Sequence, residues 1–348
     1  MESGQRHSIR HRDFKDVPVI DRRRFVALTG CFAAGLSPAE RAHGQAAMRR
    51  IGFLSAFSRT SVDAFLAQLR PELQGLGWTD GRNIVVLEPR TAEGANERLP
   101  SMATELVAQS PDLLLVQTSP ATRALALATK SIPIVMIGVG APVELGIVAD
   151  YKKPGGNVTG SSYLADELAR KLLQFLKEAA PRLRSVAVFV NPSNEAAAPL
   201  IRQTRTDALA LGLQAQIVEV SSKGDFEPAF AAIRRANTES ILLPPEPLIQ
   251  VNREAIATFA NAHGLPLVVV GSRGGLPSTG LFGYGPASLE YAKATARYVD
   301  RIFRGARPAD LPVEQPTRFS LVINLKVATA LGLTIPQAML LRADEVIR

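Results

Sequence analysis

The amino-acid sequence predicts an α/β protein with two doubly wound lobes, each built on a parallel β-sheet. Two observations carry this prediction. Short apolar runs bounded by turn residues alternate with segments of helical periodicity, which is typical of strands buried on both faces of a parallel sheet. The alternation occurs twice, and a segment rich in Pro and Gly, residues 153–160, separates the two series. We interpret that segment as a crossover between the lobes.

The first series begins after Arg50. Its expected strands are 51–54, 84–87, 113–116 and 134–137. Its expected helices are 62–76, 99–109 and 121–130. Pro71 lies inside the first helix, where its missing N–H and its ring are expected to kink the helix or to end its first half.

The second series follows the crossover. Its expected strands are 186–190, 216–220, 241–243 and 267–270, and its expected helices are 165–179, 196–211, 226–236 and 249–263. The remaining chain offers a strand at 281–284, a helix at 288–303, a strand at 319–323 and the start of a helix at 326–331. These pieces are too few for a third domain, so they are expected to join the two lobes.

Length and composition agree with this organisation. The chain has 348 residues, of which 46% are hydrophobic, enough for about two domains with full cores. A single Cys excludes a disulfide scaffold, and the apolar content excludes a disordered chain. The net charge of +8 is partly an N-terminal property, because residues 1–46 hold eight Arg and Lys against five acidic residues. We therefore expect no nucleic-acid partner.

Residues 1–46 are predicted to be an export signal. Arg22, Arg23 and Arg24 precede an apolar stretch that is too short to span a membrane, and small residues follow it. Paired arginines before apolar residues resemble the twin-arginine signal of bacteria. The sequence thus predicts a periplasmic protein with a cleaved signal, whereas a basic tail is the alternative. A lipid anchor at Cys31, which follows Leu-Thr-Gly, is less favoured because its apolar region is very short.

The residues that carry most enzyme chemistry are missing from the remaining chain. It has no phosphate-binding loop of the Gly-x-x-x-x-Gly-Lys type and no dinucleotide-binding glycine motif after a strand. His263 is the one histidine after residue 46, and its place at a helix end predicts a C-terminal cap. We expect no catalytic residues, no metal and no cofactor.

Several segments match a known family. They are Ile51-Gly52-Phe53-Leu54-Ser55, residues 75–84 (Gly-Leu-Gly-Trp-Thr-Asp-Gly-Arg-Asn-Ile), residues 154–160, residues 312–317, residues 322–326 and the ending Arg342-Ala343-Asp344-Glu345-Val346-Ile347. Over residues 50–348 the chain resembles ABC-transporter substrate-binding proteins of the group with tryptophan- and tyrosine-binding members.

This resemblance implies a type I periplasmic-binding-protein fold, in which three crossovers join two lobes that close on a small ligand. Lobe one would comprise residues 47–157 and 279–316, and lobe two residues 158–278 and 317–348. Asn157, Thr159 and Gly160 would then lie at the hinge. The implied partners are a small-molecule ligand and an ABC permease of the inner membrane, and the protein would act as a monomer.

The expected ligand site lies beyond the carboxyl ends of the strands, where loops of both lobes face one cleft. The candidate ligand-binding residues directly follow predicted strands or, for Tyr284, end one: Ser55, Thr118, Ser119, Gly140, Asn191, Glu246, Arg273 and Tyr284. Hydroxyl groups and helix N-termini suit a carboxylate, and Glu246 suits an ammonium group. A zwitterionic amino acid would satisfy both.

Each candidate also has a plain structural interpretation. The Ser and Thr residues are common helix caps, and Asn191 belongs to an Asn-Pro-Ser-Asn turn. Glu246 and Arg273 fit solvated loop charges, and Tyr284 fits packing at the hinge. The chain also departs from the family, which usually has Asp at the position of Ala141 and often has Asp at the position of Glu246. These departures leave the ligand class open.

Two functions follow. The favoured one is an exported solute-binding receptor that delivers a small ligand, such as an amino acid, to a permease. The alternative is a cytoplasmic ligand sensor or an enzyme on the same two-lobe fold, since a fold does not determine a function.

Overall fold

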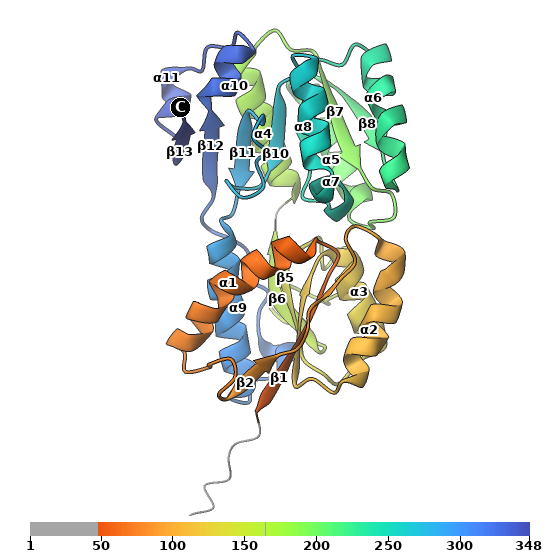
Figure 1. Ribbon diagram of the computed structural model, residues 1–348, viewed down its shortest axis with the longest axis vertical. Helices are drawn as coiled ribbons and strands as arrows, with labels where there is room; N and C mark the ends of the chain where they lie inside the picture. Colours follow the sequence, from red (N-terminus) through yellow and green to blue (C-terminus); the bar gives the residue numbers. More distant parts are fainter. Residues whose placement is uncertain (1–47, 164) are drawn as a thin grey trace, which may run out of the picture. The chain divides into compact units, whose positions relative to one another are not determined.

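The structure is a computed structural model that describes residues 48–163 and 165–348, apart from the side chains of residues 165 and 166. The predicted export signal and the alternative anchor at Cys31 lie outside the described residues. From Ala47 onward the chain is one compact unit, and within it two β-sheets define two lobes (Figure 1). The predicted α/β class with two parallel-sheet lobes is confirmed.

Lobe one contains a parallel sheet in the order β2-β1-β4-β5-β6, with β3 also paired to β1. Its strands are β1 (Arg49–Ser55), β2 (Ile84–Val86), β3 (Arg90–Thr91), β4 (Leu113–Gln117), β5 (Ile134–Gly140) and β6 (Val158–Tyr163). Its helices are α1 (Arg59–Gly75), η2 (Asn96–Arg98), α2 (Leu99–Ala108), α3 (Ser119–Ala128), α9 (Ser288–Phe303) and η4 (Pro308–Asp310).

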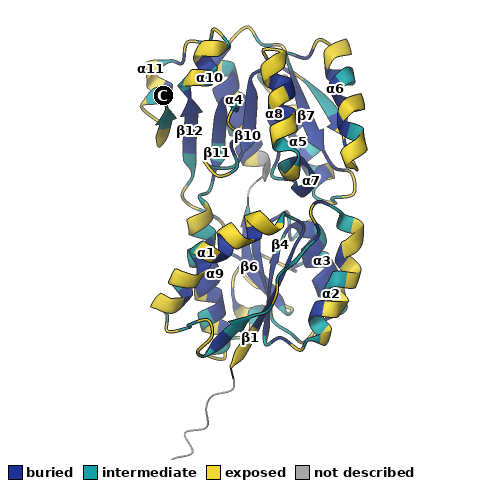
Figure 2. Ribbon diagram, viewed as in Figure 1, coloured by how far each residue is buried: buried dark blue, intermediate teal, exposed yellow. Residues whose placement is uncertain are grey.

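Alternation along β1 directs side chains to both faces of this sheet. Ile51 and Phe53 pack with α1 and α9, whereas Leu54 packs with α2 and α3 on the opposite face. Figure 2 shows that the central strands are largely buried while the outer faces of these helices are exposed. Two helical layers therefore cover one sheet, and the chain contributes the late helix α9 to this early lobe.

Lobe two contains a seven-stranded sheet in the order β13-β12-β11-β10-β9-β7-β8, parallel except for the β11–β12 pair. Its strands are β7 (Ser185–Val190), β8 (Gln214–Glu219), β9 (Ile241–Leu243), β10 (Leu267–Val270), β11 (Phe282–Gly285), β12 (Ser320–Asn324) and β13 (Glu345–Ile347). Its helices are α4 (Ala165–Ala179), α5 (Ala197–Ala210), η3 (Lys223–Asp225), α6 (Phe226–Arg235), α7 (Pro247–Val251), α8 (Arg253–Ala262), α10 (Leu325–Ala330) and α11 (Gln337–Leu340).

The sheet pairings correct two predicted lobe boundaries. Residues 158–163 were expected in lobe two, but they form β6, which pairs with β5 of lobe one. Residues 281–284 were expected in lobe one, but β11 pairs with β10 of lobe two. The first crossover therefore follows Tyr163 and the second follows Gly285, each at the carboxyl end of a strand. The third runs between Glu314, which is bridged to Ser161, and Ser320 at the start of β12.

The three residues expected at the hinge consequently lie within lobe one. Asn157 directly precedes β6 and donates from Nδ2 to the carbonyl oxygens of Thr129 and Ile132 at 3.1 and 2.8 Å. Thr159 Oγ1 donates to the Leu311 carbonyl at 2.7 Å. Gly160 has a φ of +128°. In the sequence this glycine indicates a crossover between lobes, whereas in the structure it permits close packing of two strands.

Smaller differences concern single elements. Helix α1 continues through Pro71, so the proline does not end it. The expected helix 249–263 is interrupted at Asn252, between α7 and α8. β3, β13 and α11 were not predicted, because each has four residues or fewer and no clear period. His263 is the C-cap of α8, as predicted, with Nδ1 2.8 Å from the Phe259 carbonyl oxygen.

Candidate functional site

A cavity of about 430 Å³ lies between the carboxyl ends of the two sheets. Lobe one contributes the following lining residues: Phe57, Thr60, Ser61, Ala64, Phe65, Gln68, Gln117, Thr118, Ser119, Ile137, Gly138, Gly140, Tyr163, Ser288 and Tyr291, with Pro286 from the second crossover. Lobe two contributes Leu168, Asn194, Pro245, Pro247, Gln250, Arg253, Val270, Gly271, Ser272, Gly274 and Gly275. The cavity has the size and mixed lining of a small-molecule site.

Four aromatic rings line this cavity, and they suit the flat body of an organic ligand. They are Phe57, Phe65, Tyr163 and Tyr291. Tyr291 projects from α9 toward β5, where a Cβ at position 138 would lie 3.0 Å from its ring carbon Cζ. Gly138 thus leaves room for the ring. Burial raises the pKa of the Tyr291 phenol above its ordinary value, so this group stays neutral.

Three polar atoms with no hydrogen-bond partner in the structure belong to lining residues. They are Thr118 Oγ1, Gln68 Oε1 and Arg253 Nε. Thr118 has a φ of +80° and precedes α3 without capping it through its side chain. Buried polar groups are normally paired, so these three atoms lack the partners that such groups usually have.

Thr118, Ser119 and Gly140 line the cavity where the sequence placed them. Ser119 Oγ donates to the Gly140 carbonyl at 3.2 Å, which connects the loops after β4 and β5. Ser55 is fully buried and does not line the cavity. Its hydroxyl donates to Gln117 Oε1 at 3.0 Å and accepts from the Phe57 N–H at 3.1 Å. Ser55 therefore positions two lining residues.

Asn191 and Glu246 lie together in lobe two, next to the main cavity. Asn191 Nδ2 donates to Glu246 Oε1 at 3.0 Å, and Glu246 Oε2 accepts from the Ile249 N–H at 3.0 Å as the N-cap of α7. Both residues line a small recess that shares Tyr163 with the cavity. Burial raises the pKa of Glu246 to about 7, partly offset by these hydrogen bonds.

Two further candidates lie away from the cavity. Arg273 forms an ion pair with Glu345, with Nε 3.1 Å from Oε1. The ring of Tyr284 packs against Phe175 and Phe319, at centroid distances of 5.4 and 5.9 Å. Neither residue lines the main cavity. Arg273 follows its strand by three residues, and its side chain pairs with the edge strand β13 instead of facing the cleft.

Sequence reasoning missed the residues that helices contribute. Thr60, Ala64 and Gln68 lie four residues apart on α1, and all three line the cavity. A spacing of four residues places side chains on the same face of a helix, and this spacing is visible in the sequence. Arg253 and Tyr291 stand near the starts of α8 and α9, and neither follows a strand directly. Searching only the strand ends could not find them.

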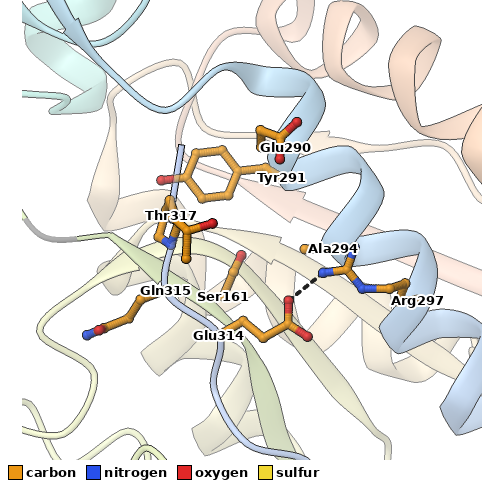
Figure 3. A pocket seen from close by; sticks show the side chains of 9 residues that line it. Ser161, Glu290, Tyr291, Ala294, Arg297, Glu314, Gln315 and Thr317 are labelled. Carbon is orange, nitrogen blue, oxygen red and sulfur yellow. Dashed lines mark hydrogen bonds and ion pairs between the residues drawn. The ribbon is translucent and has the colours of Figure 1, made fainter. Parts of the chain in front are cut away.

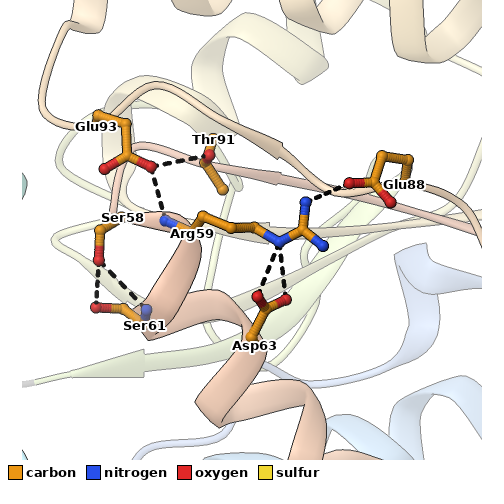
Figure 4. A network of polar contacts seen from close by, with 7 residues as sticks. All are labelled: Ser58, Arg59, Ser61, Asp63, Glu88, Thr91 and Glu93. Atoms are coloured by element: carbon orange, nitrogen blue, oxygen red, sulfur yellow. Dashed lines mark hydrogen bonds and ion pairs between the residues drawn. The ribbon is translucent and has the colours of Figure 1, made fainter.

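The start of α1 is fixed by a polar network (Figure 4). Arg59 Nε donates to both carboxylate oxygens of Asp63 at 2.8 and 3.0 Å, and its Nη1 pairs with Glu88. The Arg59 backbone N–H donates to Glu93 at 2.7 Å, and Thr91 also donates to Glu93. These contacts hold the turn that carries Phe57 and Thr60 to the cavity.

A second pocket, of about 330 Å³, lies where the third crossover leaves lobe one (Figure 3). Ser161, Tyr291 and an Arg297–Glu314 ion pair of 2.5 Å line it. Tyr291 lines both pockets and thus stands between them. The ion pair is about half-exposed, so it resembles an ordinary surface pair more than a catalytic pair.

Within residues 48–348, apart from those left undescribed, no cluster of His, Cys, Asp and Glu could hold a metal ion. Among the same residues, no helix has the length and apolar character to cross a membrane.

Comparisons with known proteins agree with this architecture. A family model described as ABC transporter substrate binding protein matches residues 50–347. The tyrosine-binding protein of Clostridioides difficile strain R20291 is 25% identical over 318 residues, which cover 88% of each chain. An ABC domain from Streptococcus pneumonia, solved in complex with L-Trp, has a TM-score of 0.80 at 26% identity and covers 86% of this chain and 100% of its own. A conserved domain protein from Vibrio cholerae has a TM-score of 0.79 at 27% identity, over 86% of this chain and 99% of its own.

Proposed function

Because the chain belongs to the ABC transporter substrate-binding protein family, we propose that it is an exported receptor that binds a small organic ligand between its lobes. The receptor then delivers this ligand to an ABC permease of the inner membrane, and it acts as a monomer. The family consists of binding proteins, not enzymes. One relative is named for tyrosine binding and another was solved in complex with L-Trp, so aromatic amino acids are the first ligands to test.

The cavity between the lobes is the observation that carries this proposal. Four aromatic rings line it, and so do the unpaired polar atoms of Thr118, Gln68 and Arg253. Aromatic walls favour a flat apolar body, while isolated polar groups favour a defined orientation of that body. Polar atoms that the protein leaves unpaired beside a cavity give a ligand hydrogen-bonding partners at no cost in protein contacts.

The three crossovers support a closing motion. The first two follow strand ends, at Tyr163 and Gly285, and the third follows the β-bridge at Glu314, so each lobe can move as a unit. Hinge rotation about such short segments brings the two walls onto a bound ligand. Thr118 and Ser119 of lobe one would then face Arg253 of lobe two across the ligand.

Ligand retained during purification is the most direct test. We expect mass spectrometry of the denatured protein to release a small molecule in stoichiometric amount, and the same molecule to raise the melting temperature of ligand-free protein. At 100 times its dissociation constant it should add about 2.7 kcal/mol to the free energy of unfolding. A folded protein that retains nothing, and that no aromatic amino acid or related acid stabilises, would contradict the proposal.

Export is tested separately by fractionation. If residues 1–46 form a twin-arginine signal, the double substitution Arg22→Lys and Arg23→Lys should leave the protein in the cytoplasm at its full length. Wild-type protein found only in the cytoplasm with its leader intact would instead favour a cytoplasmic ligand sensor. Mass analysis of the exported chain distinguishes cleavage before residue 48 from a lipid at Cys31.

A further inference from the structure

Charge is distributed unevenly around the cavity. Among the described residues that line it, Arg253 is the only one with a formally charged side chain. A cation without a carboxylate in the same lining favours an anionic ligand over a zwitterionic one, because an ammonium group would have no counter-charge.

The contacts of the Arg253 guanidinium are long. Nη1 lies 3.5 Å from the Gln250 carbonyl oxygen and 3.4 Å from Gln250 Oε1. Nε has no hydrogen-bond partner, and its nearest carboxylate oxygen, on the adjacent Glu254, is 3.7 Å away. The side chain is 32% exposed. A guanidinium offers five N–H donors in a plane, so most of its capacity is free for a planar carboxylate.

The sequence predicts that Glu246 pairs with the ammonium group of a ligand. The contacts of Glu246 in the structure argue against this pairing. Each of its oxygens accepts a hydrogen bond inside lobe two, from Asn191 and from Ile249. The residue lines the small recess and not the main cavity. Its raised pKa also reduces its negative charge near neutral pH.

From this arrangement we infer that the ligand is an aromatic carboxylate without an ammonium group, and that Arg253 is the residue that binds its carboxylate. The inference rests on the proposed function and specifies its ligand class. The ring of the ligand lies among Phe57, Phe65, Tyr163 and Tyr291 of lobe one, and its carboxylate meets the guanidinium of lobe two.

Matched compounds test the ammonium group. Phenylalanine is compared with 3-phenylpropionate, and tryptophan with indole-3-propionate, by calorimetry on the purified protein after its retained ligand has been removed. We expect the acids without the amine to bind at least 10-fold more tightly than the amino acids. Tighter binding of the amino acids would overturn the inference and leave the receptor function intact. Binding of neither class would overturn the inference, and the test for a retained ligand then decides separately whether the receptor function stands.

A thermodynamic cycle that combines a substitution of Arg253 with a neutral analogue of the ligand tests whether Arg253 binds the carboxylate. Arg253→Gln should weaken binding of the carboxylate by about 10- to 100-fold, the range for a lost hydrogen bond to a charged group. Binding of the matching neutral amide, 3-phenylpropionamide, should hardly change. Arg253→Lys keeps the charge and should restore part of the affinity. Arg235→Gln, on the exposed end of α6, is the control for the loss of a positive charge. Equal losses for acid and amide would show that Arg253 does not bind the carboxylate.

Discussion

The two walls of the cavity differ in chemistry. Lobe one provides all four aromatic rings, and they lie on or beside well-packed elements: β1, α1, β6 and α9. Lobe two provides Arg253, together with proline and glycine residues of the loops after β9 and β10. One wall thus offers shape and apolar area, and the other offers charge.

This difference suggests an order of events during binding. A ligand can first settle its ring on lobe one, where apolar contact requires no second wall. Closure then brings the Arg253 guanidinium to the carboxylate, and the charge is shielded from water only at that stage, where its interaction is strongest. Lobe one would determine which ligand rings fit the cavity, and lobe two would determine whether closure of the lobes on the ligand is favourable.

The largest predicted effect tests the packing on which the wall of lobe one rests. A Cβ at position 160 would lie 2.2 Å from the Met136 carbonyl oxygen and 2.6 Å from its nitrogen, at a φ of +128°. Gly160→Ala must therefore separate β5 from β6, and we expect it to lower the free energy of unfolding by about 4 kcal/mol or more. Chemical denaturation measures this change.

The matched control lies in lobe two. A Cβ at Gly274, in a lining loop, meets nothing within 4 Å, so Gly274→Ala should change the free energy of unfolding by less than about 1 kcal/mol. Similar losses for the two variants would show that the close packing of β5 against β6 contributes no more to stability than the loop that carries Gly274.

The next effect concerns Glu246 in lobe two. Burial raises its pKa from 4.5 to about 7. The folded state therefore binds more protons than the unfolded state between these values, and the free energy of unfolding falls as pH rises through this window. The decrease attributable to this group is of order 3 kcal/mol. In Glu246→Gln this part of the decrease should disappear, as measured by denaturation from pH 4 to 8.

Glu227→Gln, at an exposed position of α6, is the control and should keep the wild-type dependence. If Glu246→Gln and the wild type give parallel curves, Glu246 is ionised in the folded protein, and a counter-charge for a ligand ammonium would again be present beside the cavity.

Much of the fold could be predicted because each lobe repeats one pattern. Buried parallel strands such as β4 and β7 are continuous apolar runs, and helix α9 has the predicted bounds Ser288–Phe303. The lobe boundaries were misplaced because the crossovers carry no signal of their own. Gly160 permits close packing against Met136. In the sequence, however, it follows Pro154 and Gly155 and therefore indicates a crossover between the lobes.

The sequence placed residues at the cavity only where the sheet itself positions them. Thr118, Ser119 and Gly140 directly follow or end strands and reach the cavity. Arg273 also follows a strand, but the edge strand β13, which was not predicted, supplies Glu345 as its partner. Residues on helices, such as Arg253, depend on how the helix is oriented on the sheet, and one sequence does not determine that orientation.

A smaller effect distinguishes apolar binding from charge. Phe57→Ala removes one ring from the wall of lobe one, and we expect affinity for the ligand to fall about 10-fold. Because the lost contact is apolar, the loss should be the same at 0.05 and 0.5 M salt, whereas the loss in Arg253→Gln should shrink as salt rises. Leu209→Ala, at an exposed position of α5, is the control for the loss of an apolar side chain away from the cavity and should leave affinity unchanged. A salt-dependent loss in Phe57→Ala would contradict the division between the walls.

The smallest effect concerns the rim, where the lobes contact each other directly. Arg123 of α3 pairs with Glu195 of the loop before α5, and Asn96 Nδ2 donates to Ser193 Oγ at 3.1 Å. The paired side chains are 38% and 42% exposed, so water and salt screen their attraction, and such pairs contribute about 0–1 kcal/mol. Glu195→Gln should therefore raise the ligand dissociation rate by less than about 5-fold at 0.15 M salt, and the association rate should stay within about 2-fold of wild type, because the pair forms only when the lobes meet. Stopped-flow fluorescence measures both rates, with Glu227→Gln as the control. A 100-fold faster dissociation would mean that this rim pair, and not the Arg253 carboxylate contact, holds the closed state.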